Sequence, residues 1–563
     1  MGLAPLTETQ DSLPKALRPI WELLRQQSIG AINEGLEAFS ALCKADSVIS
    51  DRILDTTGVF PRPGSRSAIA RLQPGSRFTR ADEDSNPYLI YALMGVLSRS
   101  SKSSRGAELR QAIQCLDIQC PGVPEVVGFT GLMELRLSLV EPKGCENAGD
   151  SCRLAGQFGQ LPLLEKLELI TSNQSVKSID LMPAPKLKTL VASGIGLHSV
   201  EGLAEIHNLV NVDLSCNPQL KDLSPLSVSS ASIRRLSLCG TGINGLEDIQ
   251  GLKELDLLNI NECERVVSLD SLSHLTITQR EFELRLPNLN QLKPMPTLTG
   301  NGLSLAQVRV TSLDGIEDAR NVDALALSDM NLLSDISAVK RLVSLRRFSI
   351  ADCDEITTLQ TLQHTHELVD VHVGSCRKLS VLPATWPLTL RSLKISGCPI
   401  EELGQIPGDF AGELDLSECN MLKSLNGLSG CTRITVVRVD CQPRDFSVLA
   451  TLPDIWLCLD YKNHPLEPSD QLIESLKALT RLNLKIVGSR RMSRLAPLSC
   501  LGGLSSLDIS ELHVEDIDFI LGLERLEVLK IPPRTKLSKR LGGCTFDSAM
   551  DIAKLKLLLL ASA

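Results

Sequence analysis

The chain has 563 residues, of which 43% are hydrophobic and only 3% aromatic, and its formal net charge is −9 at pH 7. The apolar share excludes a chain that is disordered throughout, and the negative charge argues against non-specific nucleic-acid binding by the whole surface. With so few aromatic residues, a core has to be built from Leu, Ile and Val, which suits many small, similar layers.

Residues 1–57 are predicted to be helical. Ser12 is a candidate N-cap with Pro14 early in the helix, and apolar residues then recur at helical spacing: Ile29, Ile32, Leu36, Phe39 and Cys43. Two roles are open for these helices: a cap on the fold that follows, which we favour, or a separate partner-binding module. No charged stretch followed by an apolar core opens the chain, so we expect no secretory signal.

Residues 58–86 are rich in Pro, Gly and Arg and are predicted to form a linker. The alternative interpretation is a basic segment for RNA or an acidic protein surface, formed by Arg62, Arg66, Arg71, Arg77 and Arg80. Residues 87–106 return to a helical pattern and end in a Ser-rich connector that is open to phosphorylation.

One pattern recurs from residue 107 to residue 533. Four consecutive segments share apolar residues at their first, fourth and sixth places, with Cys three residues after the sixth. The sixth-place residues lie 23, 22, 21 and 23 residues apart: Ile350, Val373, Ile395, Leu416 and then Val439. Their alternation predicts a short strand in each copy, and the copies must stack because one alone cannot bury its apolar face.

The same frame extends to about 18 copies in all. The first copy contains Ile113, Leu116 and Ile118. In each copy the residues at the fourth and sixth places form an inward pair, which is expected to point into the core. The further inward pairs are Leu135/Leu137, Leu167/Leu169, Val212/Leu214, Leu258/Ile260, Val308/Val310, Leu325/Leu327, Leu482/Leu484, Leu507/Ile509 and Leu529/Ile531. The pattern weakens over residues 276–292 and 451–461, and residues 140–160 read as an insertion between copies.

These copies resemble the leucine-rich repeat (LRR) family in its short class of roughly 22 residues, which includes internalin-like and phosphatase-regulatory arrays. We call the position three residues after the sixth place the ladder position. Cysteine at this position resembles cysteine-type repeats and LRR proteins of trypanosomatid parasites: Cys263, Cys353, Cys376, Cys398 and Cys419. The resemblance implies an α/β repeat, a curved leucine-rich-repeat solenoid with parallel β-strands on its concave face and an N-terminal α-helical cap region. Residues 534–563 are expected to form a C-terminal cap, with a short helix that Asp547 begins.

Residues 234–249 carry a competing signal. Gly240, Gly242 and Gly245 follow an apolar run, and Glu262 lies at the distance that a dinucleotide-binding fingerprint requires. The repeat frame instead makes Thr241 the ladder residue and places the three glycines in turns. We therefore expect no cofactor.

The 17 cysteines include no Cys-x-x-Cys pair, so we expect packed, reduced thiols, no metal and a cytoplasmic protein. The H-E-x-x-H, P-loop and G-x-S-x-G patterns do not occur in the sequence, and we predict a protein without catalytic activity.

The outward residues of the predicted strands indicate a protein-binding face, because small side chains there are mixed with a few long charged ones. The candidate partner-binding residues are Arg309, Arg347, Asp370, His372, Lys394, Asp415, Arg438 and the outward Trp456. The sequence favours an interaction scaffold or adaptor, without a small-molecule substrate and without a membrane. The alternatives are a regulatory or substrate-recognition subunit of a phosphatase or ubiquitin ligase, or an RNA-associated assembly factor that uses the basic linker.

Overall fold

The computed structural model describes residues 18–24, 26, 28–45, 76–78, 87–100, 104–120, 124–139, 161–171, 176–179, 184–319, 321–431, 434, 436–439, 447–452, 454–460, 470–491, 495–514, 516–533, 538–539 and 541–562. The chain divides into two compact units. Unit 1 comprises Met1–Gln279 and Leu286–Asn288, and unit 2 comprises Arg280–Arg285 and Leu289–Ala563.

Four helices precede the first repeats of unit 1: α1 (Arg18–Leu24), α2 (Ile29–Ala45), α4 (Pro87–Arg99) and α5 (Ser104–Ala112). Helix α4 packs between α2 and strand β2 (Ile113–Cys120). Gly95 permits this close approach, because a Cβ there would lie 2.4 Å from Cδ1 of Leu36. The end of α4 is fixed by an Arg99–Glu125 ion pair of 2.5 Å and by Arg110, which donates hydrogen bonds to the carbonyls of Leu97 and Ser100. Helices α4 and α5 therefore pack against strand β2.

The main sheet of unit 1 is parallel, in the order β1 (Ser76–Phe78), β2, β3 (Glu134–Leu139), β4 (Lys166–Thr171), β5 (Thr189–Val191), β6 (Asn211–Asp213), β7 (Arg235–Ser237) and β9 (Leu257–Asn259). A separate parallel pair joins β8 (Glu254–Leu255) to β10 (Thr276–Ile277). Strand β5 is a copy that the sequence frame missed, because its second inward residue is the small Ala192, which is fully buried beside Leu190.

Strand β1 corrects the prediction that residues 58–86 are only a linker. It extends the sheet beyond β2, with Arg77 paired to Cys115 in the parallel register. The other four arginines of the predicted basic segment lie outside the described residues, as does the predicted insertion at residues 140–160.

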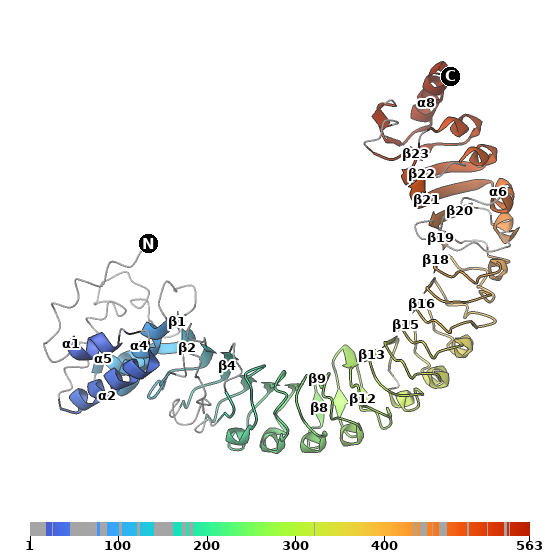
Figure 1. The fold of residues 1–563 in the computed structure, drawn as a ribbon. Helices are drawn as coiled ribbons and strands as arrows, with labels where there is room; N and C mark the ends of the chain where they lie inside the picture. Colours follow the sequence, from blue (N-terminus) through green and yellow to red (C-terminus); the bar gives the residue numbers. More distant parts are fainter. Residues whose placement is uncertain are drawn as a thin grey trace. The chain divides into compact units, whose positions relative to one another are not determined.

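Thirteen of the described strands of unit 2 form one sheet, in the order β11 (Glu281–Leu284), β13 (Gly302–Ala306), β14 (Ala324–Ser328), β15 (Arg347–Ala351), β16 (Asp370–Gly374), β17 (Ser392–Ser396), β18 (Glu413–Ser417), β19 (Val436–Val439), β20 (Asp454–Asp460), β21 (Arg481–Arg491), β22 (Leu504–His513), β23 (Val528–Lys530) and β24 (Thr545–Phe546). All pairs are parallel except β23 with β24. Within unit 2 the strands line the concave side of the stack (Figure 1). This confirms the predicted fold, and the five sixth-place residues from Ile350 to Val439 pair in the predicted register.

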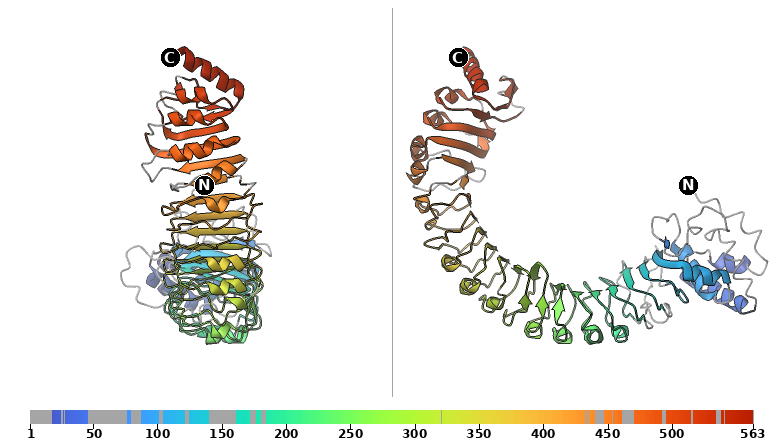
Figure 2. Two further views of the ribbon diagram at one scale, coloured as in Figure 1. Left: turned by 90° about the vertical axis from the view of Figure 1, so that its right-hand side faces the viewer. Right: turned by 180° about the vertical axis from the view of Figure 1, so that it is seen from behind.

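The remaining described elements are one strand, two α-helices and eleven 3₁₀ helices. They are β12 (Thr297–Leu298), the helices α6 (Asp470–Lys477) and α8 (Ala549–Ser562), and the 3₁₀ helices η5 (Glu201–Leu203), η6 (Ser224–Ser229), η7 (Glu247–Ile249), η8 (Asp270–Leu272), η9 (Ile316–Asp318), η10 (Ser337–Arg341), η11 (Gln360–His364), η12 (Asn426–Leu428), η13 (Ser447–Thr451), η14 (Ala496–Cys500) and η15 (Asp518–Gly522). Helix α8 lies across the end of the unit 2 stack (Figure 2). Its N-cap is Ser548 rather than the predicted Asp547, because the Ser548 hydroxyl accepts a hydrogen bond from the backbone N–H of Asp551. No described helix is long and apolar enough to cross a membrane.

The predicted register is wrong in one copy. Val308 and Val310 were expected to be the inward pair of a strand, but the strand is β13, and Leu303 and Leu305 point inward from it. Val308 occupies the ladder position of this turn. Apolar residues at 303, 305, 308 and 310 fit two frames five residues apart, and no cysteine distinguishes them.

A left-handed residue follows each of the strands β5–β7, β9 and β13–β18 and directly precedes the ladder residue. Its φ is 58° at Cys216, 60° at Glu262 and 53° at Asp352, and Gly240 takes the same position with φ 66°. At Gly242 the chain passes close to the neighbouring turn, because a Cβ there would lie 2.1 Å from the carbonyl oxygen of Pro218. The glycines of the apparent dinucleotide motif thus belong to the repeat.

Candidate functional site

The sheet register brings most of the predicted site residues together on the concave face of unit 2. One row joins Arg347 to Asp370, Ser392 and Glu413, and the next joins Ser349 to His372, Lys394, Asp415 and Arg438. Neighbouring parallel strands lie about 4.8 Å apart, so these side chains form a continuous surface over β15–β19.

Arg309 does not belong to this surface. It was expected on a strand with Gln307 and Thr311, but β13 ends at Ala306, and Arg309 is an exposed residue beyond the ladder position. The outward residues that β13 contributes are Gly302, Ser304 and Ala306. The sequence missed them because of the register error described above.

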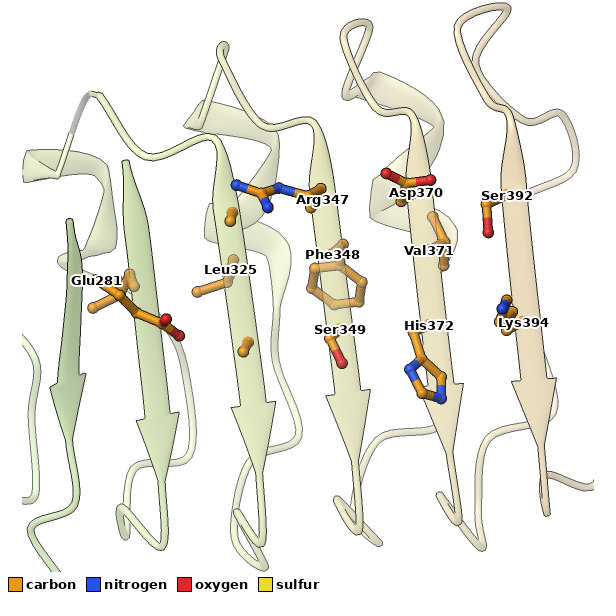
Figure 3. Close-up of a pocket in the computed structure, with 13 residues that line it drawn as sticks. Glu281, Leu325, Arg347, Phe348, Ser349, Asp370, Val371, His372, Ser392 and Lys394 are labelled. Carbon is orange, nitrogen blue, oxygen red and sulfur yellow. The ribbon is translucent and has the colours of Figure 1, made fainter. Parts of the chain in front are cut away.

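A hollow of about 240 Å³ opens on this face over β11–β17 (Figure 3). Its floor is formed by small outward residues such as Ala324, Ala326 and Ser349, above the buried Phe348. Longer side chains stand at its edges: Glu281, Arg347, Asp370, His372 and Lys394. The hollow exists because the floor side chains end at or near Cβ whereas the edge side chains extend from the sheet. Glu281 is a lining residue that lies in the region of weak sequence pattern.

Most long charged side chains on this face are held by intramolecular ion pairs. Arg347 lies 3.1 Å from Asp323, and Lys394 lies 3.0 Å from Glu413. Within the described part of the chain, the side chains of Asp370 and His372 carry no such pair. Arg347 and Lys394 at the edges of the hollow are therefore oriented before any partner arrives, whereas Asp370 and His372 are open to new contacts.

Arg438 and Asp415 form the most buried of these pairs, at 3.1 Å, with only 14% of the Asp415 side chain exposed. Burial acts to lower the pKa of Arg438, but the charge of Asp415 and a hydrogen bond with Cys458 outweigh it, so the pKa is raised. This arginine stays charged and anchored to its neighbour strand.

Trp456 lies on β20 and points outward, as predicted, with 38% of its surface exposed. Its backbone pairs with Val436 on one side and with Asn483 on the other. Three strand spacings, or roughly 14 Å, separate it from β17, so it lies on the same face as the hollow but outside it.

The ladder cysteines of unit 2 donate hydrogen bonds to the backbone of their own turns. Cys353 and Cys376 donate hydrogen bonds from sulfur to the carbonyls of Ala351 at 3.3 Å and Gly374 at 3.4 Å. Burial raises the pKa of Cys353 to about 12, so the thiol stays protonated. Asn217 fills the same position in unit 1 and bonds backbone groups of its own and a neighbouring turn, including Ala192 O at 2.8 Å and the N–H of Gly196 at 2.9 Å. Among the described residues, no three His, Cys, Asp or Glu side chains gather in a way that could hold a metal ion.

Three features now coincide: parallel strands at the repeat period, a left-handed residue after the strand, and a buried ladder residue that bonds the backbone. The chain folds as a leucine-rich-repeat solenoid.

Comparisons with known proteins give distant matches to proteins of this kind, and no family model matches the chain. The disease resistance protein RPP4 of Arabidopsis thaliana is 21% identical over 326 residues, which is 50% of this chain and 27% of that protein. The LRR chain thus matches about a quarter of the length of this curated relative.

Two solved structures illustrate the structural likeness. An LRR protein of Leptospira interrogans is 16% identical, with a TM-score of 0.39 over 75% of this chain and 97% of that one. The functional domain of InlJ from Listeria monocytogenes, which includes a cysteine ladder, is 15% identical, with a TM-score of 0.34 over 65% of this chain and 79% of that one.

Proposed function

We propose that this LRR protein is a non-catalytic scaffold or adaptor that binds a protein partner on the concave face of unit 2, from β11 to β20. The observation that carries the proposal is the hollow over β11–β17, where Ala324, Ala326 and Ser349 form a floor between longer side chains. Small side chains lose little conformational entropy on binding, and the ion-paired Arg347 and Lys394 are already ordered, so a partner meets a preorganised surface.

The dimensions favour a protein rather than a small molecule. At about 240 Å³ the hollow is smaller than the pockets of roughly 300–1,000 Å³ that enclose drug-sized ligands. The face as a whole runs over nine neighbouring strands, which span roughly 38 Å at the usual strand spacing. A standard protein interface needs about 800 Å² on each partner, and a face of this length can supply it.

The finer alternatives rest on different parts of the molecule. A regulatory or substrate-recognition subunit of a phosphatase or ubiquitin ligase would use the same concave face, and the resemblance to short-class repeats supports it. An RNA-associated role would use the arginines around Arg77. We further propose a cytoplasmic location, since the buried ladder cysteines are free thiols in both units.

Affinity purification of the whole chain followed by mass spectrometry tests this function. Ala326→Trp fills the hollow with a bulky side chain and should remove the partner from the captured set. Leu388→Trp is the matched control, because Leu388 is 77% exposed and lies outside the face. A captured set that is the same for all three proteins would exclude the concave hollow as the binding site. Co-purified phosphatase or ligase subunits would support the regulatory role, and RNA crosslinks confined to residues 62–80 would support the RNA role.

A further inference from the structure

Helix α8 carries a second apolar face that nothing in the chain's described part covers. Its first face packs on β23 and η15 and consists of Ile552, Leu555 and Leu559, each no more than 3% exposed. On the other side, Met550 is 69% exposed, Leu557 67%, Leu558 56% and Leu560 61%. A single apolar face is enough to attach a helix to the end of the stack, so the exposed face requires a different explanation.

The exposed residues have the spacing of a helix-packing stripe. Met550, Ala553, Leu557 and Leu560 are separated by three, four and three residues, which places them along one line of the helix. Other strongly exposed apolar side chains in unit 2, such as Val343 and Leu388, lie singly outside the helices. Regular 3–4–3 spacing is what a second helix needs to interlock, because its side chains fit between successive turns.

We infer that this stripe binds the same stripe on a second copy of the chain, with the two α8 helices antiparallel. An antiparallel pair centred on Leu555 places Met550 opposite Leu560 and Ala553 opposite Leu557 of the other copy. Ala553 leaves a gap where Leu557 inserts, so large and small side chains alternate across the contact. The stripe is therefore complementary to itself, which a two-fold interface requires.

The charges around α8 favour a protein over a lipid surface. Asp518 and Glu524 are exposed in and beside η15, the element on which α8 packs, and Asp551 lies at the start of the helix. A helix that binds an anionic bilayer is flanked by Lys and Arg on its polar face. Of the two lysines of α8, Lys556 donates a hydrogen bond to the carbonyl of Leu523, and Lys554 lies 3.8 Å from Asp551. Between two protein copies, mixed charges at the rim are ordinary.

The exposed area indicates a weak, reversible dimer. The three large side chains of the stripe, Met550, Leu557 and Leu560, each expose on the order of 100 Å², so two copies bury roughly 600 Å² in total. That is below the size of standard interfaces, and we expect dissociation at micromolar concentration. Because α8 lies beyond β23 and outside the hollow, dimerisation is independent of the proposed function. A dimer would present two copies of the proposed partner-binding face.

Sedimentation velocity of the full chain over a dilution series, from about 1 to about 100 μM, tests the inference. The wild type should move with concentration from the monomer mass of 61.2 kDa toward twice that value. Leu557→Asp should weaken the dimer at least tenfold, because it places a charge in the buried stripe. Leu388→Asp is the matched control and should dimerise like the wild type. Both replaced side chains are exposed, so the thermal midpoints should agree with the wild type and show that each variant folds.

A mixture of Ala553→Cys and Leu557→Cys proteins tests the orientation. With diamide added as the oxidant, an antiparallel pair should give a disulfide between residues 553 and 557, identified by peptide mass, whereas a 557–557 link would contradict the antiparallel arrangement. A wild type that stays monomeric throughout, or a Leu557→Asp variant that dimerises equally well, would overturn the inference. So would wild-type binding to anionic phosphatidylserine vesicles that Leu557→Asp abolishes, since the face would then serve a membrane.

Discussion

At the scale of single residues, the ladder position determines how one turn is joined to the next. Asn217 in unit 1 and the cysteines in unit 2 occupy the same place, but they satisfy the backbone to different degrees. Asn217 is fully buried and both accepts and donates hydrogen bonds, whereas each thiol is a weak donor. The thiol ladder therefore stabilises the stack mainly by close packing, and the amide by hydrogen bonds.

Asn217→Ala should lower the free energy of unfolding of unit 1 by about 3 kcal/mol, because it leaves several buried backbone groups unpaired. Hydrogen exchange of the turns around Gly196 and Ala192 should report the loss locally, together with a lower urea midpoint. Asn208→Ala removes an exposed hydrogen bond to Pro185 and is the control, with an expected change below about 1 kcal/mol. Equal effects of the two substitutions would mean that the ladder amide has no special role.

The buried thiols should also make stability depend on alkaline pH. Burial raises the pKa of Cys353 from 9.0 to about 12, so the unfolded chain loses this proton at lower pH than the folded chain. The stabilisation is fully present below pH 9 and is lost as the pH rises from 9 toward 12. The difference in unfolding free energy between the wild type and Cys353→Ala should shrink over that range. At pH 9 a maleimide should modify the exposed Cys216 but not Cys353, and equal labelling would contradict the burial.

At the scale of the elements, each strand is stable only as part of the stack. Strand β17 shows this, because Leu393 and Ile395 point into the shared core while Ser392, Lys394 and Ser396 face outward. Its neighbours β16 and β18 repeat the same division in register, so the core is continuous from turn to turn. A disruptive substitution at one inward position therefore destabilises the adjacent turns as well.

Leu393→Asp should unfold several neighbouring turns of unit 2. Leu393 is fully buried, and an unpaired carboxylate in an apolar core typically costs several kcal/mol. Limited proteolysis should cut within β16–β18, and the thermal midpoint should fall. Ser396→Asp introduces the same group on the outward side of the same strand and should leave both measurements nearly unchanged. Resistance of Leu393→Asp to protease would show that the strand register is wrong here.

At the scale of the whole molecule, the concave face of unit 2 offers a partner two separate features, the hollow at β11–β17 and Trp456 on β20. A protein that contacts both has to span at least three strand spacings, from β17 to β20. Ion pairs hold the charges of Arg347, Lys394 and Arg438 in place, so a partner whose own charges do not complement them is disfavoured. Dimerisation through α8 would present this face twice.

Trp456→Ala should weaken partner binding by about 2 kcal/mol, the magnitude of an interface hot spot, with little change in folding because the side chain faces outward. Lys394→Glu should weaken it further, since the new acid would lie beside Glu413 and reverse the local charge. The two sites are far apart, so the effects should add. Titration calorimetry with the identified partner measures both, and unchanged affinity of the double variant would move the binding site elsewhere. Deleting residues 1–105 should leave affinity intact, which distinguishes the concave face from a binding module in the N-terminal helices.

The sequence by itself determined the repeat and the inward and outward sides of β15–β19. It also placed seven of the eight candidate residues on the outward side of their strands, six of them on β15–β19 and Trp456 on β20. It could do so because alternation along a strand and the period between strands are local properties of the chain. Only the tertiary structure decided the frame at β13, where Leu303 and Val308 fit equally well, and so the place of Arg309. It also revealed β1 beside β2, the pairing of Arg347 with Asp323, and the exposed side of α8 with Leu557. Those features depend on which segments become neighbours in space, and stacking determines this through contacts that no single copy of the repeat contains.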